Sequence, residues 1–249
     1  MAKRIMTRST KRKLRTRVSK RRIKRRLSKR RLSKRRLSKR RLSKRRVRRG
    51  GKPSNDILDT LNIPMEATSV DLSMKLINKS QGELDAIFQA LQTLPNLQYL
   101  GLAFNQLTAL PESLGNLSNL QKLYLQYNQL RELPNSLGNL SKLQYLDLEG
   151  NQLTTLPSSL GNLKSLQELW VDKNQLTVLP ESLFSEGNLP NLKTLCLREN
   201  QLTTLPESLF SEENLPNLQW VAFNDNQHNI SDQDPRLANL RERGCTVHD

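Results

Sequence analysis

The chain of 249 residues has few of the side chains on which disulfide-bonded or metal-stabilised folds depend. It contains two cysteines, Cys196 and Cys245, and neither belongs to a CxxC pair or to another spacing typical of a zinc site. Its two histidines, His228 and His248, both lie near the C-terminal end. We therefore expect neither a disulfide framework nor a metal centre, and interpret the cysteines as reduced thiols.

The sequence also lacks a long apolar run. No stretch approaches the roughly 18 to 20 apolar residues that a membrane-spanning helix needs, and no apolar segment of a secretory signal follows the basic N-terminus. We therefore expect an intracellular protein, nuclear or cytoplasmic, without a membrane span. A mitochondrial transit peptide is an alternative, since the N-terminus is rich in Arg and Ser, although it has no amphipathic period.

Acidic and aromatic residues are absent from residues 1–52, which we call the basic arm. The arm holds 29 of the 41 Lys and Arg residues, whereas residues 53–249 carry 12 basic and 23 acidic side chains, a net charge of −11. The overall charge of +18 therefore comes from the arm, which is attached to an acidic body. Without aromatic side chains, the arm offers no platform on which single-stranded bases can stack.

Within the arm, the pentapeptide LSKRR occurs four times in succession, from Leu27 to Arg46. A period of five gives neither a helix nor a strand an apolar face, so we expect the arm to be disordered. Its charge predicts binding to nucleic acid or another polyanion with little sequence preference. Two alternatives stay open, a nuclear import signal and a low-complexity expansion without a partner. The predicted polyanion-binding residues are Arg25, Arg26, Arg30, Arg31, Arg35, Arg36, Arg40, Arg41, Arg45 and Arg46.

Each pentapeptide contains a serine that follows Arg-Arg-Leu, a context that resembles the Arg-Arg-x-Ser substrates of basophilic kinases. These candidate phosphorylation sites are Ser28, Ser33, Ser38 and Ser43. Four phosphates would add about −6 to −8 charges, which weakens polyanion binding without reversing the sign of the arm.

The rest of the chain is organised around a repeated stretch, first seen as LQYLGLAFNQL at residues 97–107. Related copies begin at residues 120, 143, 166, 192 and 218. Alternating leucines predict short strands with one buried face, and the asparagine that follows can satisfy the backbone groups of a turn. No single repeat buries both of its faces, so neighbours must stack. The asparagines, at intervals of 23, 23, 23, 26 and 26, are Asn105, Asn128, Asn151, Asn174, Asn200 and Asn226.

The spacing L-x-x-L-x-L-x-x-N-x-L resembles the signature of leucine-rich repeats over residues 67 to about 230. The intervening segments, such as TALPESLGNLSN, are similar to the intracellular Ras-group and bacterial-type repeats of 23 residues, and residues 70–96 are closer to the longer ribonuclease-inhibitor type. The resemblance implies an α/β solenoid. Its short parallel strands would form a concave face, with an irregular or short helical convex side.

Four segments are predicted: the disordered arm (1–52), an N-terminal cap with an atypical first repeat (53–96), the leucine-rich repeats (97–230) and a C-terminal cap (231–249). In the first repeat, Ile77 aligns with Leu107 and Lys75 replaces the asparagine. Helices are expected at residues 54–61 and 82–91 and from Asp234 to Gly244. The two longer repeats carry Phe184 and Phe210, which we expect to fill the widened convex side.

Strand residues that point away from the core would form the concave face, and every Tyr and Trp of the chain falls among them. Aromatic side chains dominate interface hot spots, and the face becomes acidic toward its C-terminal end, so we predict binding of a protein or peptide. Exposed strand positions also favour aromatics for structural reasons, which is the alternative. The predicted residues are Tyr99, Phe104, Tyr124, Tyr127, Tyr145, Asp147, Glu149, Glu168, Trp170, Asp172, Arg198 and Trp220.

No nucleophile and base arrangement, phosphate loop or metal-binding motif is visible, so neither catalysis nor a cofactor is expected. The sequence predicts a monomeric, non-enzymatic scaffold that binds a protein on its concave face and a polyanion through the arm. The alternative is a nucleic-acid-associated structural protein in which the arm is the functional part. A third hypothesis is autoinhibition, because the arm and the acidic face carry opposite charges.

Overall fold

The computed structural model describes residues 56–227 and 234–248. The described residues all belong to one compact unit, residues 55–249. The basic arm lies outside the described residues. The predictions of its disorder, its polyanion-binding arginines and its phosphorylated serines therefore concern residues that are not described. His228 also lies outside them.

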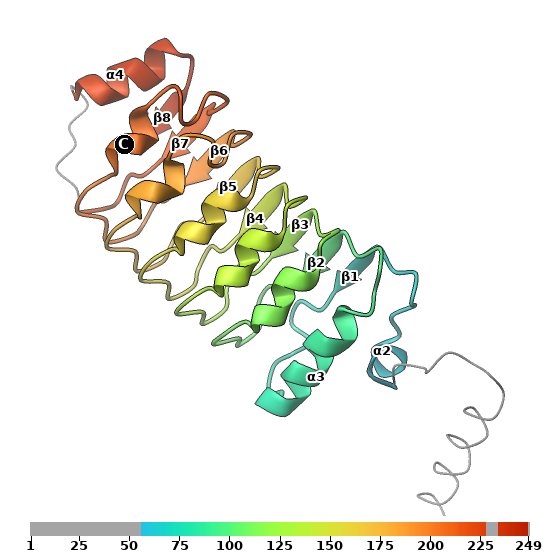
Figure 1. Ribbon diagram of the computed structural model, residues 1–249. Helices are drawn as coiled ribbons and strands as arrows, with labels where there is room; N and C mark the ends of the chain where they lie inside the picture. Colours follow the sequence, from blue (N-terminus) through green and yellow to red (C-terminus); the bar gives the residue numbers. More distant parts are fainter. Residues whose placement is uncertain (1–55, 228–233, 249) are drawn as a thin grey trace, which may run out of the picture. The chain divides into compact units, whose positions relative to one another are not determined.

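Eight parallel strands form one open sheet in the order of the sequence (Figure 1). Neighbouring strands pair in register, so Leu100, Leu123 and Leu146 occupy equivalent positions in adjacent strands. This arrangement confirms the predicted solenoid of short parallel strands. The strands are β1 (Ser69–Asp71), β2 (Tyr99–Gly101), β3 (Lys122–Tyr124), β4 (Tyr145–Asp147), β5 (Glu168–Trp170), β6 (Thr194–Cys196), β7 (Trp220–Ala222) and β8 (Thr246–His248).

The core lies between the sheet and the return segments that connect its strands. The middle residue of each strand from β1 to β7 points into this core and is buried. The apolar residue that follows each of these strands joins it: a leucine, except for Val171 after β5 and Phe223 after β7. Since strand side chains alternate between faces, the flanking residues of each strand point the other way. The leucine spacing therefore decides which side chains are left for binding.

Each 23-residue repeat returns through a proline and a single short turn of 3-10 helix. A proline with extended backbone stands directly before each of these turns, as Pro111 does with a ψ of 147°. Neighbouring turns approach so closely that a Cβ on Gly115 would lie 2.2 Å from the Ser136 carbonyl oxygen. The turns are η1 (Glu112–Asn116), η2 (Asn135–Asn139), η3 (Ser158–Asn162), η4 (Glu181–Phe184) and η5 (Glu207–Phe210), the last two in the longer repeats.

The repeated asparagines join adjacent repeats through side-chain hydrogen bonds. Asn151 donates from Nδ2 to the carbonyl oxygens of Leu148, at 2.9 Å, and Leu125, at 3.1 Å. Its Oδ1 accepts a hydrogen bond from the amide of Leu130, at 3.1 Å. The same pattern recurs at the other asparagines from Asn105 to Asn226, which confirms the role expected for an amide at this turn.

The predicted helices are present at both ends of the described unit. They are α2 (Asp56–Leu61), α3 (Gln81–Leu91) and α4 (Pro235–Glu242). The Asp234 carboxylate caps α4 by accepting a hydrogen bond from the amide of Arg236. Phe184 and Phe210 are buried in the longer repeats, as expected.

The first repeat and the C-terminal tail differ from expectation. Leu76, rather than Ile77, enters the core, because this turn is one residue shorter than the later ones: the amide of Leu76 donates to Asn105 as that of Leu107 donates to Asn128. Ile77 is 40% exposed. Residues 246–248, for which no strand was expected, pair with β7 and extend the sheet.

Candidate functional site

The sheet face is the name used here for the side of the sheet that points away from the core. It comprises the first and third residue of each strand and the two residues before each repeated asparagine, or before Lys75 in the first repeat. Equivalent positions form columns across the strands because the pairing is in register. It corresponds to the predicted concave face.

Three tyrosines form a continuous row across β2, β3 and β4. The ring centroids of Tyr99 and Tyr124 are 5.0 Å apart, and those of Tyr124 and Tyr145 are 4.8 Å apart. The register explains the row, since Tyr99 and Tyr145 flank Lys122 in one column and Tyr124 stands in the next. All three side chains are half-buried, so each presents part of its ring to solvent.

A second aromatic pair lies at the turn that follows the strands. Phe104 and Tyr127 stack with centroids 4.7 Å apart and planes 18° apart, and they are 43% and 38% exposed. Both adopt a positive φ, near 55°, which costs a bulky residue about 1 to 2 kcal/mol. Met74 occupies the equivalent position of the first repeat with a φ of 59° and is 63% exposed. Three successive turns thus hold large apolar side chains in solvent.

Beyond this pair the sheet face becomes ionic. Glu149 accepts hydrogen bonds from the Tyr127 hydroxyl and the Lys173 ammonium, both at 2.7 Å. Burial raises the pKa of Glu149, but Lys173 and Tyr127 outweigh that effect, and its pKa lies below the usual value. Glu149 therefore remains a carboxylate, and its charge is neutralised within the face.

Asp172 is neutralised in the same way by the next repeat. Its Oδ1 accepts hydrogen bonds from the backbone amide of Arg198 at 2.8 Å and from the guanidinium Nε at 3.2 Å. Burial nevertheless raises the pKa of Asp172, since its side chain is almost fully enclosed. Arg198 is half-buried, so the pair presents little free charge.

Asp147 differs from these carboxylates because it forms no ion pair with a Lys or Arg among the described residues. It is 8% exposed and accepts a hydrogen bond from the amide of Glu149 at 3.0 Å. Burial, together with the neighbouring Glu149 and Asp172, raises its pKa to about 6. A buried carboxylate between two other acids is costly to ionise.

Ten of the twelve predicted site residues are exposed or half-buried on the sheet face. Asp147 and Asp172 were expected to be exposed with them, but both are buried. Tyr124 and Trp170 flank Asp147 in the strand register, and the Arg198 guanidinium lies against Asp172. Trp170 donates from Nε1 to Glu168 at 3.2 Å. Trp220 is separated from the tyrosine row and stacks instead on His248, with centroids 4.3 Å apart.

Two residues of the face, Met74 and His248, were not among the predicted site residues. The alignment of Lys75 with Asn105 already places Met74 opposite Phe104, so the repeat pattern was sufficient to predict that Met74 lies on the face. His248 belongs to the tail after the last repeat, where no leucine pattern marks a strand, and only the pairing of β8 brings it to the face.

Other chemistry is limited in the part of the chain that the structure describes. Burial raises the pKa of the Cys196 thiol to about 12 and that of Cys245 to about 11, so neither is a ready nucleophile. No group of three or more His, Cys, Asp and Glu side chains that could hold a metal ion occurs among residues 56–227 and 234–248. Over the same ranges, no helix has both the length and the apolar character to traverse a bilayer.

Comparisons with known proteins agree with this architecture. A leucine-rich-repeat protein of Leptospira interrogans shares 26% identity, with a TM-score of 0.59, over 80% of this chain and 58% of that one. An internalin from Listeria monocytogenes shares 27% identity, with a TM-score of 0.52, over 64% of this chain and 43% of that one. The chain thus spans about half the length of these structures.

No match was found among the curated proteins. A family model described as a leucine-rich repeat region matches residues 72–247. That range covers well over half of the chain, and it contains the strands from β2 to β7, most of β8 and the repeated asparagines. The chain therefore belongs to the leucine-rich-repeat family.

Proposed function

We propose that the protein is a non-enzymatic scaffold that binds a protein or peptide partner on its sheet face. The observation that carries this proposal is the tyrosine row, in which Tyr99, Tyr124 and Tyr145 contact one another in solvent-accessible positions. Aromatic side chains bring a large contact area at a low entropic cost, and they are enriched in interface hot spots. The leucine-rich-repeat fold itself supports a protein-interaction role.

The chemistry of the sheet face favours a partner with two different ends. Met74, Phe104 and Tyr127 present apolar surface at the N-terminal repeats. Carboxylates outnumber the aromatics from Asp147 onward, and Lys173 and Arg198 only partly neutralise them. A partner with an apolar end and a basic end fits this gradient.

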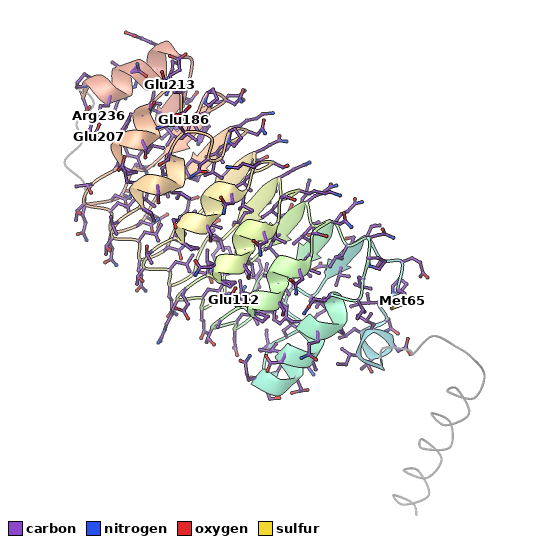
Figure 2. All side chains as sticks on the ribbon, in the orientation of Figure 1. Met65, Glu112, Glu186, Glu207, Glu213 and Arg236 are labelled. Atoms are coloured by element: carbon purple, nitrogen blue, oxygen red, sulfur yellow. The ribbon has the colours of Figure 1, made fainter. Side chains whose placement is uncertain are left out.

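A capture experiment tests the role of the face. Full-length protein carrying Tyr124→Ala and Trp170→Ala is compared with the unaltered protein as bait, and bound proteins are identified by mass spectrometry. The control bait carries Glu186→Ala and Glu213→Ala, in the return segments of the two longer repeats (Figure 2). We expect the face variant alone to lose a partner. An unchanged set of partners on the face variant, with its circular dichroism preserved, contradicts the proposal.

We further propose that the basic arm binds nucleic acid or another polyanion and so adds a second attachment to the scaffold. Its support is the concentration of 29 Lys and Arg residues without an acidic residue in the first 52 positions. In the alternative function, a nucleic-acid-associated structural protein, the arm alone acts and the repeats only supply a folded body.

Salt titration tests the role of the arm, which binds the polyanion in both functions. Binding of duplex DNA and of RNA is measured from low to high salt for the full chain and for a variant that lacks residues 1–52. We expect a steep salt dependence, with a slope of about −0.9 per contacted phosphate on DNA, that disappears with the arm. Binding that survives removal of the arm contradicts the role of the arm in both functions, since the body has a net charge of −11.

A further inference from the structure

The centre of the sheet face combines aromatic rings with carboxylates in adjacent strands. In the pairing of β4 with β5, Tyr145 stands opposite Glu168 and Asp147 stands opposite Trp170. Tyr124 of β3 pairs with Asp147 in the register and contacts the Tyr145 ring at 4.8 Å. These five residues, which we call the central cluster, therefore occupy two adjacent columns of three neighbouring strands.

The central cluster has a charge that its surroundings do not neutralise. Glu149 and Asp172 each have a basic partner, Lys173 at 2.7 Å and Arg198 at 3.2 Å. No such ion pair involves Asp147 or Glu168 among the described residues. Asp147 is more than nine-tenths buried, and its neighbours Glu149 and Asp172 are themselves acidic. Charge complementarity at this point requires a cation from outside the repeats.

The aromatic rings define which kind of cation fits. Two tilted tyrosine faces and an indole are attractive surfaces for an organic cation, and Arg is found over such rings more often than Lys. A divalent metal ion would need more oxygen ligands than two carboxylates in separate columns provide. The Trp170 indole N–H donates to Glu168 at 3.2 Å, which orients both the ring and the carboxylate before any ligand arrives.

We propose that the central cluster is the binding site for a single arginine side chain of the protein partner. The guanidinium stacks on the Tyr124 and Tyr145 rings beside Trp170, its N–H groups donate to the half-buried Glu168, and its positive charge compensates the buried Asp147 carboxylate. A planar fork of donors suits carboxylates better than the compact ammonium of Lys does. The inference rests on the proposed function, which it makes specific by naming the side chain that the face recognises.

The test uses the indole N–H of Trp170 as its reporter. The chain has two tryptophans, so full-length protein with Trp220→Phe gives one indole signal in a proton–nitrogen NMR spectrum. The probe is the capped peptide acetyl-Gly-Arg-Gly-amide, and the matched control peptide contains citrulline, which has the shape of arginine without its charge. We expect a saturable shift of the Trp170 signal with the arginine peptide and no shift with citrulline.

Two substitutions locate the site. Asp147→Asn keeps the size of the side chain and its acceptor oxygen, and we expect it to weaken binding of the arginine peptide at least ten-fold. Asp225→Asn, at the exposed C-terminal end of the face, serves as the matched control and should change binding less than two-fold. Equal binding by both variants, or an equal response to the two peptides, overturns the inference.

The capture experiment tests the proposed function independently of the arginine site. If the arginine peptide gives no shift while the Tyr124→Ala and Trp170→Ala bait still loses its partner, the arginine site is wrong and the binding face stands. If the bait loses nothing, the proposed function itself fails. The two results are therefore distinguishable.

Discussion

Buried polar side chains affect this solenoid in two opposite ways, depending on whether their hydrogen-bonding groups and charges are matched. Five of the six repeated asparagines are buried, and their side chains bond backbone groups of two adjacent repeats, as Asn151 does. Asp147 is equally buried, but it has no cationic partner in the described chain. The first kind holds the fold together, whereas the second opposes folding whenever it is ionised.

Replacing Asn151 by Ala should be strongly destabilising. The substitution leaves the carbonyl oxygens of Leu125 and Leu148 and the amide of Leu130 without their partner, at about 1 to 3 kcal/mol for each buried group. We expect the free energy of unfolding in urea to fall by about 3 kcal/mol or more. The control Asn162→Ala alters an exposed asparagine of the same repeat and should change it by less than about 0.5 kcal/mol.

Replacing Asp147 by Asn should instead stabilise the protein at neutral pH. The pKa of Asp147 rises from 3.8 in the unfolded chain to about 6 in the folded one. The folded state therefore binds more protons between pH 4 and 6, and this group reduces stability as the pH rises through that window. We expect the Asn variant to gain about 1 to 3 kcal/mol at pH 7.5 and to lose that part of the pH dependence.

The measurement is urea denaturation from pH 4 to pH 8 for both proteins. At pH 4 the two stabilities should nearly coincide, because Asp147 is then protonated in the folded state. If Asp147→Asn were less stable than the unaltered protein at pH 7.5, the ionised Asp147 carboxylate would have to have a stabilising partner, which contradicts the prediction.

At the scale of the elements, the C-terminal helix α4 is attached to the last longer repeat through one arginine. The Arg236 guanidinium lies 4.8 Å from the centre of the Phe210 ring and donates to Glu207 at 2.6 Å, a residue next to it at the end of the solenoid (Figure 2). It also donates to Asp234, the residue that caps the helix. Leu237 and Leu240 complete the contact with the core.

Arg236→Ala should loosen this end without unfolding the repeats. Loss of the cation–π contact and of the charged hydrogen bonds removes about 1 to 2 kcal/mol of local stability. We expect amide hydrogen exchange in α4 and β8 to become about 5- to 30-fold faster. Exchange in β3 and β4 should stay unchanged, as should exchange everywhere in the control Glu242→Ala. Uniform acceleration along the chain would contradict a local role.

The elements show which parts of the structure a single sequence can predict. Strands and asparagine turns follow from leucine spacing, because burial of alternate side chains leaves only one arrangement. Strand β8 has one repeat neighbour and no leucine signature, so nothing local marks it. The burial of Asp147 and Asp172 depends on side chains in adjacent repeats, which the spacing does not encode. The shift from Ile77 to Leu76 reflects a turn shortened by one residue, and alignment by Lys75 concealed it.

At the scale of the whole molecule, stability should be a sum of repeats and of the contacts between neighbours. In-register pairing makes each 23-residue repeat an interchangeable layer, since every strand presents the same positions to both neighbours. The two ends of the described unit differ from the middle. There helices α2 and α4 stand in the place where a further repeat would otherwise stack.

Removing one complete layer should therefore leave a folded protein. Deletion of residues 143–165 joins Lys142 to Leu166 and preserves the repeat phase. We expect cooperative urea unfolding with a smaller denaturant slope, since less surface is buried. Deletion of residues 143–153, about half a layer, shifts the leucines out of phase and should abolish folding, as followed by circular dichroism. Equal behaviour of the two deletions would contradict a layered core.

The in-register columns also offer contact positions at a fixed spacing to any partner that lies across the strands. Successive repeats are about 4.8 Å apart, whereas side chains on one side of an extended peptide recur about every 6.8 Å. Such a peptide drifts out of phase with the columns within two or three repeats. An α-helix, whose turns are about 5.4 Å apart, keeps step over a longer distance. The spacing of the columns on the sheet face therefore matches the turns of a bound helix more closely than the residues of a bound strand.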